Sequence, residues 1–208
     1  MRPSLVAAPD VSMLTETRKQ IEDSIAVKQL LLGDTRLLLQ IDNLTEACVS
    51  CLRSGYKIIF AGNGGSFADA QHLSAELTSR FLFDRLPLAS LALGTNNSAI
   101  SAIGNDYGYE QVFAREMRAV AKLGDVFIPI STSGNSPNIL AAVDVAQQLH
   151  VATVAFTGHS GGQLIQRCEC ICVPSSETPR IQECHILIGH IMCCAIESRL
   201  FNKEAAAC

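Results

Sequence analysis

The sequence predicts an α/β fold, a three-layer sandwich in which helices cover both faces of a parallel sheet of about five strands. Short and almost wholly apolar segments alternate with helical segments from residue 57 onward, a pattern typical of right-handed β-α-β units. Strands without polar alternation are buried on both faces. No repeat or linker divides the 208 residues, a normal size for one domain, so we treat 1–208 as a single domain.

Two helices are expected before the first strand. They span residues 11–53 as an N-terminal helical hairpin that breaks at Gly33-Asp34 and is closed by Gly55. Residues 1–10 are expected to be a flexible tail. Ligands of parallel sheets bind beyond the carboxyl ends of the strands, so those ends are where a site is expected. The five expected strands are residues 57–61, 89–93, 126–131, 152–156 and 170–173.

The last helical segment, residues 179–201, bears on assembly. From Cys184 to Ile196 nearly every residue is apolar, and a helix that is apolar all round must be buried. Its own sheet could bury it, and so could a subunit interface. We expect an oligomer in which the helices of residues 11–54 supply the partner surfaces.

Composition argues against several classes of partner. The formal charge of -4 and the lack of a Lys/Arg run argue against a nucleic-acid surface. No apolar stretch is expected to reach the ~18 residues of a membrane span, and the N-terminus lacks the apolar block of a signal peptide. We therefore predict a cytoplasmic protein with no membrane partner.

The nine cysteines lie mostly in apolar segments, where a free thiol acts as a small buried hydrophobe. Cys48 and Cys51 are spaced like one half of a zinc site, but the chain has no second cysteine pair of that spacing to complete it. We interpret the cysteines as core residues and regard a structural zinc at Cys48 and Cys51 as the weaker reading.

A glycine-rich loop follows the first expected strand: Gly62, Asn63, Gly64, Gly65 and Ser66. Glycines let the backbone approach a ligand closely, and a helix start offers free N–H groups to an anion. The loop is not a dinucleotide fingerprint, whose third glycine would fall at Phe67. A plain tight turn is an equally good reading of this loop alone.

A second loop, residues 131–137, carries four hydroxyls around one glycine. Pro137 suits the first position of the next helix. One serine there would be only an N-cap, but four favour a neutral phosphate cradle at a helix start. With no basic patch in the chain, hydroxyls and backbone amides would have to hold a phosphate. The four residues are Ser131, Thr132, Ser133 and Ser136.

Three further side chains are candidates for chemistry. His72 and Glu76 stand one helical turn apart and share a face, although an isolated pair of this kind is more often ordinary surface. His190 has the apolar neighbours Ile188 and Ile191, and such a histidine is more often a hydrogen-bonded core residue. The sequence patterns alone do not decide whether these three residues are catalytic or structural.

Taken together, the motifs resemble those of the phosphoheptose isomerases, members of the sugar isomerase (SIS) family. The resemblance runs in order from about Leu31 to Phe201. It implies the SIS fold, a homotetramer with a central helical bundle, and conversion of D-sedoheptulose 7-phosphate to D-glycero-D-manno-heptose 7-phosphate, the first step toward ADP- or GDP-heptose. The matching segments are 62–66, 69–72, 75–77, 104–108, 131–136 and 180–183.

The resemblance also implies roles for individual residues. Glu76 and His190 match the acid–base pair, which would move a proton between C1 and C2 through an enediol. One Zn²⁺ per subunit is implied, with the ligands His72, Glu76, Gln182 and His190. Positions that match substrate contacts are Asn63, Gly64, Gly65, Ser66, Glu76, Asn105, Asp106, Ser131, Thr132, Ser133, Ser136 and Gln182.

One departure and two rival readings accompany this resemblance. Pro179 stands where some members have an acidic residue, and His185 matches no known ligand position. Close relatives of the family are non-catalytic adaptors that bind the bacterial replication initiator, but they lack equivalents of Glu76 and His190. Isomerases of other sugar phosphates, such as arabinose 5-phosphate, resemble the His72–Glu76 helix less and usually carry an extra domain.

Gln182 and His190 predict that active sites are shared between subunits. On one regular helix, eight residues separate them by ~12 Å along the axis and ~80° around it. Zinc bonds of ~2 Å cannot easily span that distance. We therefore expect a neighbouring subunit to supply one of the two residues, with a bent or broken helix between them, weakest at Gly189, as the alternative.

Overall fold

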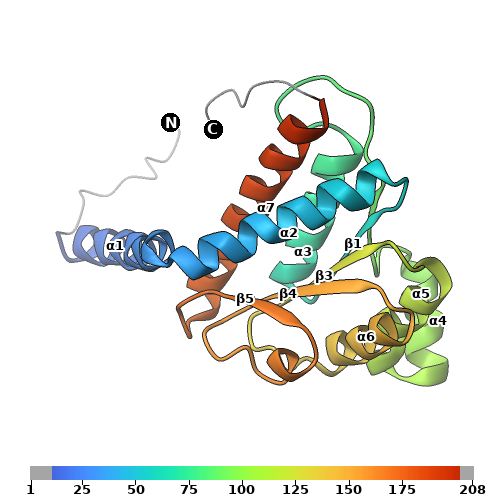
Figure 1. Ribbon diagram of the computed structural model, residues 1–208. Helices are drawn as coiled ribbons and strands as arrows, with labels where there is room; N and C mark the ends of the chain where they lie inside the picture. Colours follow the sequence, from blue (N-terminus) through green and yellow to red (C-terminus); the bar gives the residue numbers. More distant parts are fainter. Residues whose placement is uncertain (1–10, 202–208) are drawn as a thin grey trace, which may run out of the picture.

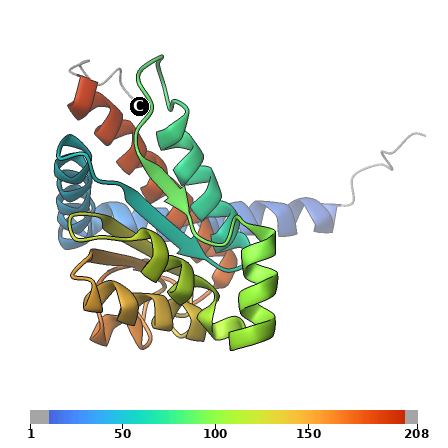
Figure 2. The same ribbon diagram turned by 90° about the vertical axis from the view of Figure 1, so that its right-hand side faces the viewer.

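The computed structural model describes residues 11–201. Two helices come first, α1 (Val11–Gly33) and α2 (Thr35–Arg53), and the predicted break between them is confirmed. Asp34 causes the new start, because its side chain accepts a hydrogen bond from the amide of Leu37 as an N-cap. α1 projects from the body of the molecule (Figures 1 and 2). The predicted tail at residues 1–10 lies outside the described residues.

The sheet has five parallel strands in the order β2-β1-β3-β4-β5, so the predicted α/β sandwich is confirmed. Its strands are β1 (Ile58–Gly62), β2 (Ser90–Ala92), β3 (Val126–Ser131), β4 (Ala152–Thr157) and β5 (Glu169–Cys172). Each differs from its predicted bounds by one residue or less at either end. Pairing of β3 with β4 is interrupted at Ile128 and Pro129, because proline has no N–H to donate.

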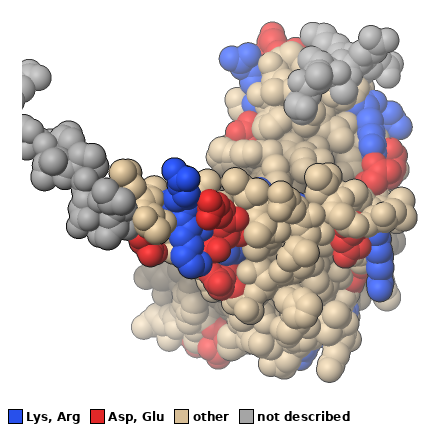
Figure 3. Space-filling model, turned by 90° about the vertical axis from the view of Figure 1, so that its left-hand side faces the viewer, with Lys and Arg blue, Asp and Glu red and all other residues tan. Residues whose placement is uncertain are grey.

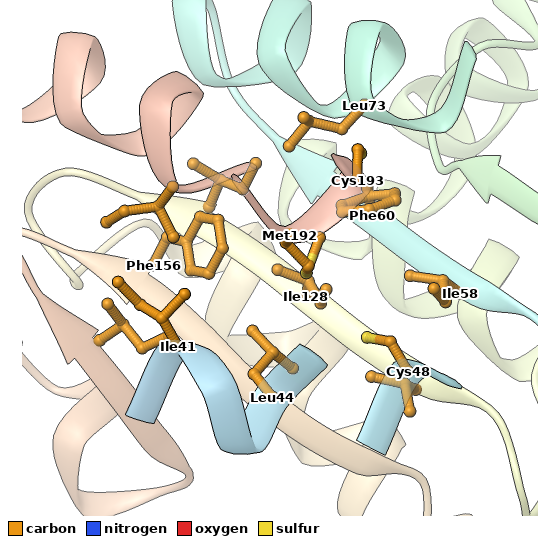
Figure 4. Close-up of a cluster of buried hydrophobic side chains, with 14 of the residues drawn as sticks. Ile41, Leu44, Cys48, Ile58, Phe60, Leu73, Ile128, Phe156, Met192 and Cys193 are labelled. Atoms are coloured by element: carbon orange, nitrogen blue, oxygen red, sulfur yellow. The ribbon is translucent and has the colours of Figure 1, made fainter. Parts of the chain in front are cut away.

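Helices cover both faces of this sheet. On one face lie α2, α3 (Gly65–Thr78) and α7 (Thr178–Phe201), whose side chains pack with alternate strand residues such as Phe60 and Ile128. Figure 4 shows this core, with Met192 and Cys193 of α7 close to Ile128 and Phe60 of the sheet. The other face carries α5 (Val112–Val120) and α6 (Pro137–Gln148). The remaining elements are α4 (Asn97–Tyr107) and two short 3₁₀ turns, Tyr109–Gln111 and Leu164–Gln166.

α7 packs against both α2 and α3 on their shared face of the sheet. Its buried residues include Ile188 and Met192, so its own sheet and helices bury much of its apolar surface. The expectation that no segment reaches the length of a membrane span was wrong for α7, which is long and apolar enough by length and composition alone. Half of the most apolar 18-residue stretch of α7 is buried inside the fold, as in the core helix of a globular domain.

Most of the described cysteines agree with the core interpretation, whereas Cys168 and Cys172 are only partly buried. Cys48, Cys51, Cys170, Cys184 and Cys193 are buried free thiols, although Cys194 is not a free thiol. Burial raises the pKa of Cys48 and Cys193, which keeps these thiols protonated and unreactive at neutral pH.

Candidate active site

The site is built where α3 and α7 run side by side in the same direction. A Cβ atom added to Gly65, at the start of α3, would lie 2.6 Å from Nε2 of Gln182 near the start of α7. Farther along, a Cβ on Gly189 would lie 2.5 Å from Cδ2 of Leu73. Glycine at 189 therefore lets the two helices approach closely, and this contact sets which residues face one another.

This register brings three predicted catalytic or metal-binding residues together within one chain. Nε2 of His72 lies 2.9 Å from Nε2 of His190 and 3.3 Å from Oε1 of Glu76. The ring of Phe81 packs on His190 with a centroid separation of 5.5 Å. His190 is thus neither a lone core histidine nor a surface residue, and it joins His72 and Glu76 in one cluster.

Partial burial sets the electrostatics of this cluster. Burial lowers the pKa of His190, and the neighbouring His72 lowers it further, while Glu76 opposes the shift. The neutral imidazole is thereby favoured at neutral pH, as a proton acceptor requires. Burial also raises the pKa of nearby Asp69 to about 6, against the effect of His72. The buried Oδ2 of Asp69 has no hydrogen-bond partner among the described residues.

The glycine-rich loop lies at the carboxyl end of β1, as predicted. Gly64 adopts a φ of 56° and Gly62 packs against the carbonyl of Ser66, so neither position accommodates a larger side chain easily. Asn63 exchanges two hydrogen bonds of 2.9 Å with Asn138 at the start of α6. A pocket of about 180 Å³ opens here, lined by Gly62, Asn63, Gly64, Phe67, Gly94, Asn97, Ile100, Tyr109 and Phe113.

The serine-rich loop lies beside it, at the carboxyl end of β3. The hydroxyls of Ser131 and Ser136 lie 3.2 Å apart. The Ser133 hydroxyl accepts a hydrogen bond from the amide of Asn135. A second pocket of about 430 Å³ includes Ser136, Asn63 and Tyr109 among its lining residues, and its charged lining residue is an acid, Glu110, rather than a lysine or arginine. An anion at this loop would therefore be held by hydroxyls and backbone amides, at the side away from Glu110.

Some predicted residues lie elsewhere. Asn105 and Asp106 line a separate depression on α4 and contact each other, so within one chain they do not join the glycine-loop pockets. Gln182 lies at Gly65 rather than at His190, and α7 is one continuous helix, so a break at Gly189 is ruled out. The sequence reading missed Asn138 and Tyr109. The signal for Asn138 was its place just after Pro137, at a helix start facing the predicted ligand.

The donor set of the cluster suits zinc, which binds imidazole nitrogen and carboxylate oxygen. Among residues 11–201, no group of three His, Cys, Asp or Glu side chains is already arranged around a metal position. Two nitrogen ligands of a tetrahedral zinc stand roughly 3.3 Å apart, so the 2.9 Å between His72 and His190 would have to widen slightly. His72, Glu76 and His190 have the donor atoms that zinc binds, but they would have to rearrange to hold it, and the same chain's Gln182 lies against Gly65 instead.

Comparison with known proteins identifies the family. The SIS domain model matches residues 27–158. "Phosphoheptose isomerase 2" of Campylobacter jejuni is 52% identical over 182 residues, 87% of this chain and 90% of its own. The chain belongs to the SIS domain family, among its phosphoheptose isomerases. A phosphoheptose isomerase of Aneurinibacillus thermoaerophilus is 48% identical over 188 residues, 90% of this chain and 95% of its own.

Solved structures of the family agree with this assignment. The chain matches a phosphoheptose isomerase from Francisella tularensis with a TM-score of 0.84 and 36% identity, covering 89% of this chain and 98% of that one. The predicted SIS fold and its N-terminal helices are therefore confirmed. As a phosphoheptose isomerase family member, the chain is a sugar phosphate isomerase, and its substrate is a small phosphorylated sugar.

Proposed function

We propose that this enzyme converts D-sedoheptulose 7-phosphate to D-glycero-D-manno-heptose 7-phosphate, the first step toward ADP- or GDP-heptose. The observation that carries the proposal is the meeting of Glu76, His72 and His190 in a chain of this family. A non-catalytic adaptor does not need an imidazole that lies within 3.3 Å of both a carboxylate and a second imidazole.

The chemistry moves one hydrogen between neighbouring carbons. A base takes the proton from C1, the C1–C2 bond becomes the double bond of an enediol, and a proton is then delivered to C2. The hydroxyl proton leaves O1 and O2 gains one, so the atoms balance. Glu76 and His190 would serve as the acid–base pair, because both are partly buried and His190 favours its neutral form.

The proposal includes one zinc ion per subunit. His72, Glu76 and His190 would hold it, and when bound it would polarise the substrate carbonyl as a Lewis acid. Ser131, Thr132, Ser133 and Ser136 would bind the substrate phosphate together with Ser66 and the amides of Gly64 and Gly65. Asn63 would contact the sugar, since its amide lines both pockets at this end of the sheet.

Assembly as a homotetramer in the cytoplasm completes the proposal. Large apolar side chains are exposed on both N-terminal helices, for example Ile21, Ile25, Leu32 and Leu39. The face of the body beside α1 carries few charged side chains (Figure 3). A neighbouring subunit would supply Asn105 and Asp106 to the substrate pockets and a Gln182 side chain to the metal cluster, because within one chain these residues lie apart from those groups.

One assay tests the function. Purified protein is incubated with sedoheptulose 7-phosphate, and the products are followed by NMR, with arabinose 5-phosphate as the competing substrate. We expect the heptose signals to grow with the wild-type protein and not with Glu76→Gln. Turnover of arabinose 5-phosphate alone, or of neither sugar, would contradict the proposal.

A further inference from the structure

A buried ion pair ties the last turns of α3 and α7 to the segment that joins α3 to β2. Nε of Arg85 donates to Oε1 of Glu197 over 2.9 Å, and both side chains are only 1% exposed. Arg85 belongs to the connecting segment and Glu197 to α7. Neither residue belongs to the sequence motifs that carry the resemblance to the family, and neither lines the glycine-loop pockets.

Arg85 caps the end of α3. The last carbonyls of a helix have no partner within the helix, and a cation there also interacts favourably with the helix dipole. One guanidinium nitrogen of Arg85 donates over 2.8 Å to the backbone carbonyl of Glu76, and the other donates to the carbonyls of Leu77 and Ser79. Arg85 therefore fixes the helical turn that carries the proposed catalytic carboxylate.

Glu197 holds the other side of the same cluster. Its two carboxylate oxygens accept hydrogen bonds from the amides of Phe81 (2.9 Å) and Leu82 (2.7 Å). Burial alone would raise the pKa of Glu197, but these amides and Arg85 hold it below its usual range. Phe81 is held in place by this bond, and its ring packs against that of His190 at an angle of 43°.

We propose that Arg85 and Glu197 are positioning residues that set the placement of Glu76 and His190 relative to each other. Arg85 acts on Glu76 through its backbone carbonyl, and Glu197 acts on His190 through Phe81. The predicted effect of this pair on turnover rests on the proposed isomerase function, whereas its predicted effect on the placement of Glu76 and His190 does not. Small displacements of reacting groups can lower rates by up to ~10²-fold, so a buried pair at this place can control kcat.

The test separates positioning from ordinary stabilisation. Arg85→Met removes the cap. Arg85→Lys keeps the charge beside Glu197 but replaces the planar fork with a single ammonium, which cannot reach all of the carbonyls. Lys57→Met is the matched control, because Lys57 pairs over 2.6 Å with the fully buried Asp125 at the amino ends of β1 and β3, away from the cluster.

Two readouts are compared, on samples shown to be folded by circular dichroism. We expect both Arg85 variants to lower kcat by about 10-fold or more, with KM for the sugar phosphate within about twofold, because the phosphate loop is untouched. In metal-free protein, the imidazole ¹⁵N resonances of His190, assigned by their loss in His190→Ala, should move. Lys57→Met should lose stability yet leave both readouts unchanged.

Other outcomes overturn the proposal. If folded Arg85→Lys retains the kcat and the His190 resonances of the wild type, the pair is structural only, and this variant decides the matter if Arg85→Met fails to fold. If Lys57→Met lowers kcat as much as the Arg85 variants do, the effect is due to lost stability and not to positioning. If wild-type protein shows no turnover, the proposed function fails, and the resonances alone still test positioning.

Discussion

His185 makes the stability of this protein depend on pH in a direction that can be worked out from its environment. The side chain is fully buried in α7, and its Nε2–H donates to the carbonyl of Thr157 over 3.1 Å. Its Nδ1 has no hydrogen-bond partner among the described residues. Burial lowers the pKa of His185 to about 4, although the bond to Thr157 opposes the shift.

The size of the effect follows from proton linkage. The pKa of an unfolded histidine is about 6.5, so between that value and about 4 the unfolded chain binds more protons than the folded one. The contribution of His185 is therefore fully present above about pH 6.5 and is lost as the pH falls. Between pH 7 and pH 5 it should cost about 2 kcal/mol of the free energy of unfolding.

Urea denaturation at pH 7 and pH 5 measures this cost. His185→Gln keeps an amide N–H for Thr157 but cannot titrate, so its loss of stability between the two pH values should be smaller than that of the wild type by about 2 kcal/mol. His150→Asn is the control, because His150 is exposed at a φ of 55°, which asparagine tolerates. Equal pH dependence in His185→Gln and wild type would refute the reasoning.

Three further predictions concern the site. Glu76→Gln and His190→Ala should each lower kcat by at least ~10²-fold with unchanged circular dichroism; near-normal turnover of folded His190→Ala would return it to a structural role. The double variant Ser131→Ala, Ser136→Ala should raise KM by about 10-fold or more, with a smaller effect on kcat; an unchanged KM would place the phosphate elsewhere. Dialysis against a chelator should abolish turnover and added Zn²⁺ restore it; full activity of verified metal-free protein would exclude a zinc requirement.

Much of the fold could be predicted because local signals and tertiary packing agree. The strands of a sheet covered on both faces are apolar throughout, so β1 and β3 stood out from their neighbours. The break between α1 and α2 carries its own chemistry in Asp34. His72 and Glu76 could be paired because one turn of helix brings them together.

The site needed information that no single segment holds. His190 meets His72 only because Gly189 lets α7 settle against Leu73 of α3, and the register of two helices is a tertiary property. The reciprocal bonds of Asn63 and Asn138 join the glycine-rich loop to the start of α6, and the two residues are 75 positions apart in the sequence. The pairing of Arg85 with Glu197 could not be predicted for the same reason, since the two residues are 112 positions apart in the sequence.

The central claim is that Glu76 and His190 of the same chain act together, and subunit mixing tests it most directly. Inactive Glu76→Gln and inactive His190→Ala proteins, carrying different affinity tags, are allowed to exchange subunits, and mixed oligomers are isolated through both tags. Every site then lacks one of the two groups, so the account predicts that sedoheptulose 7-phosphate is not turned over. Recovery of turnover in the mixed oligomers would show that the pair is completed across a subunit interface, and would contradict the account.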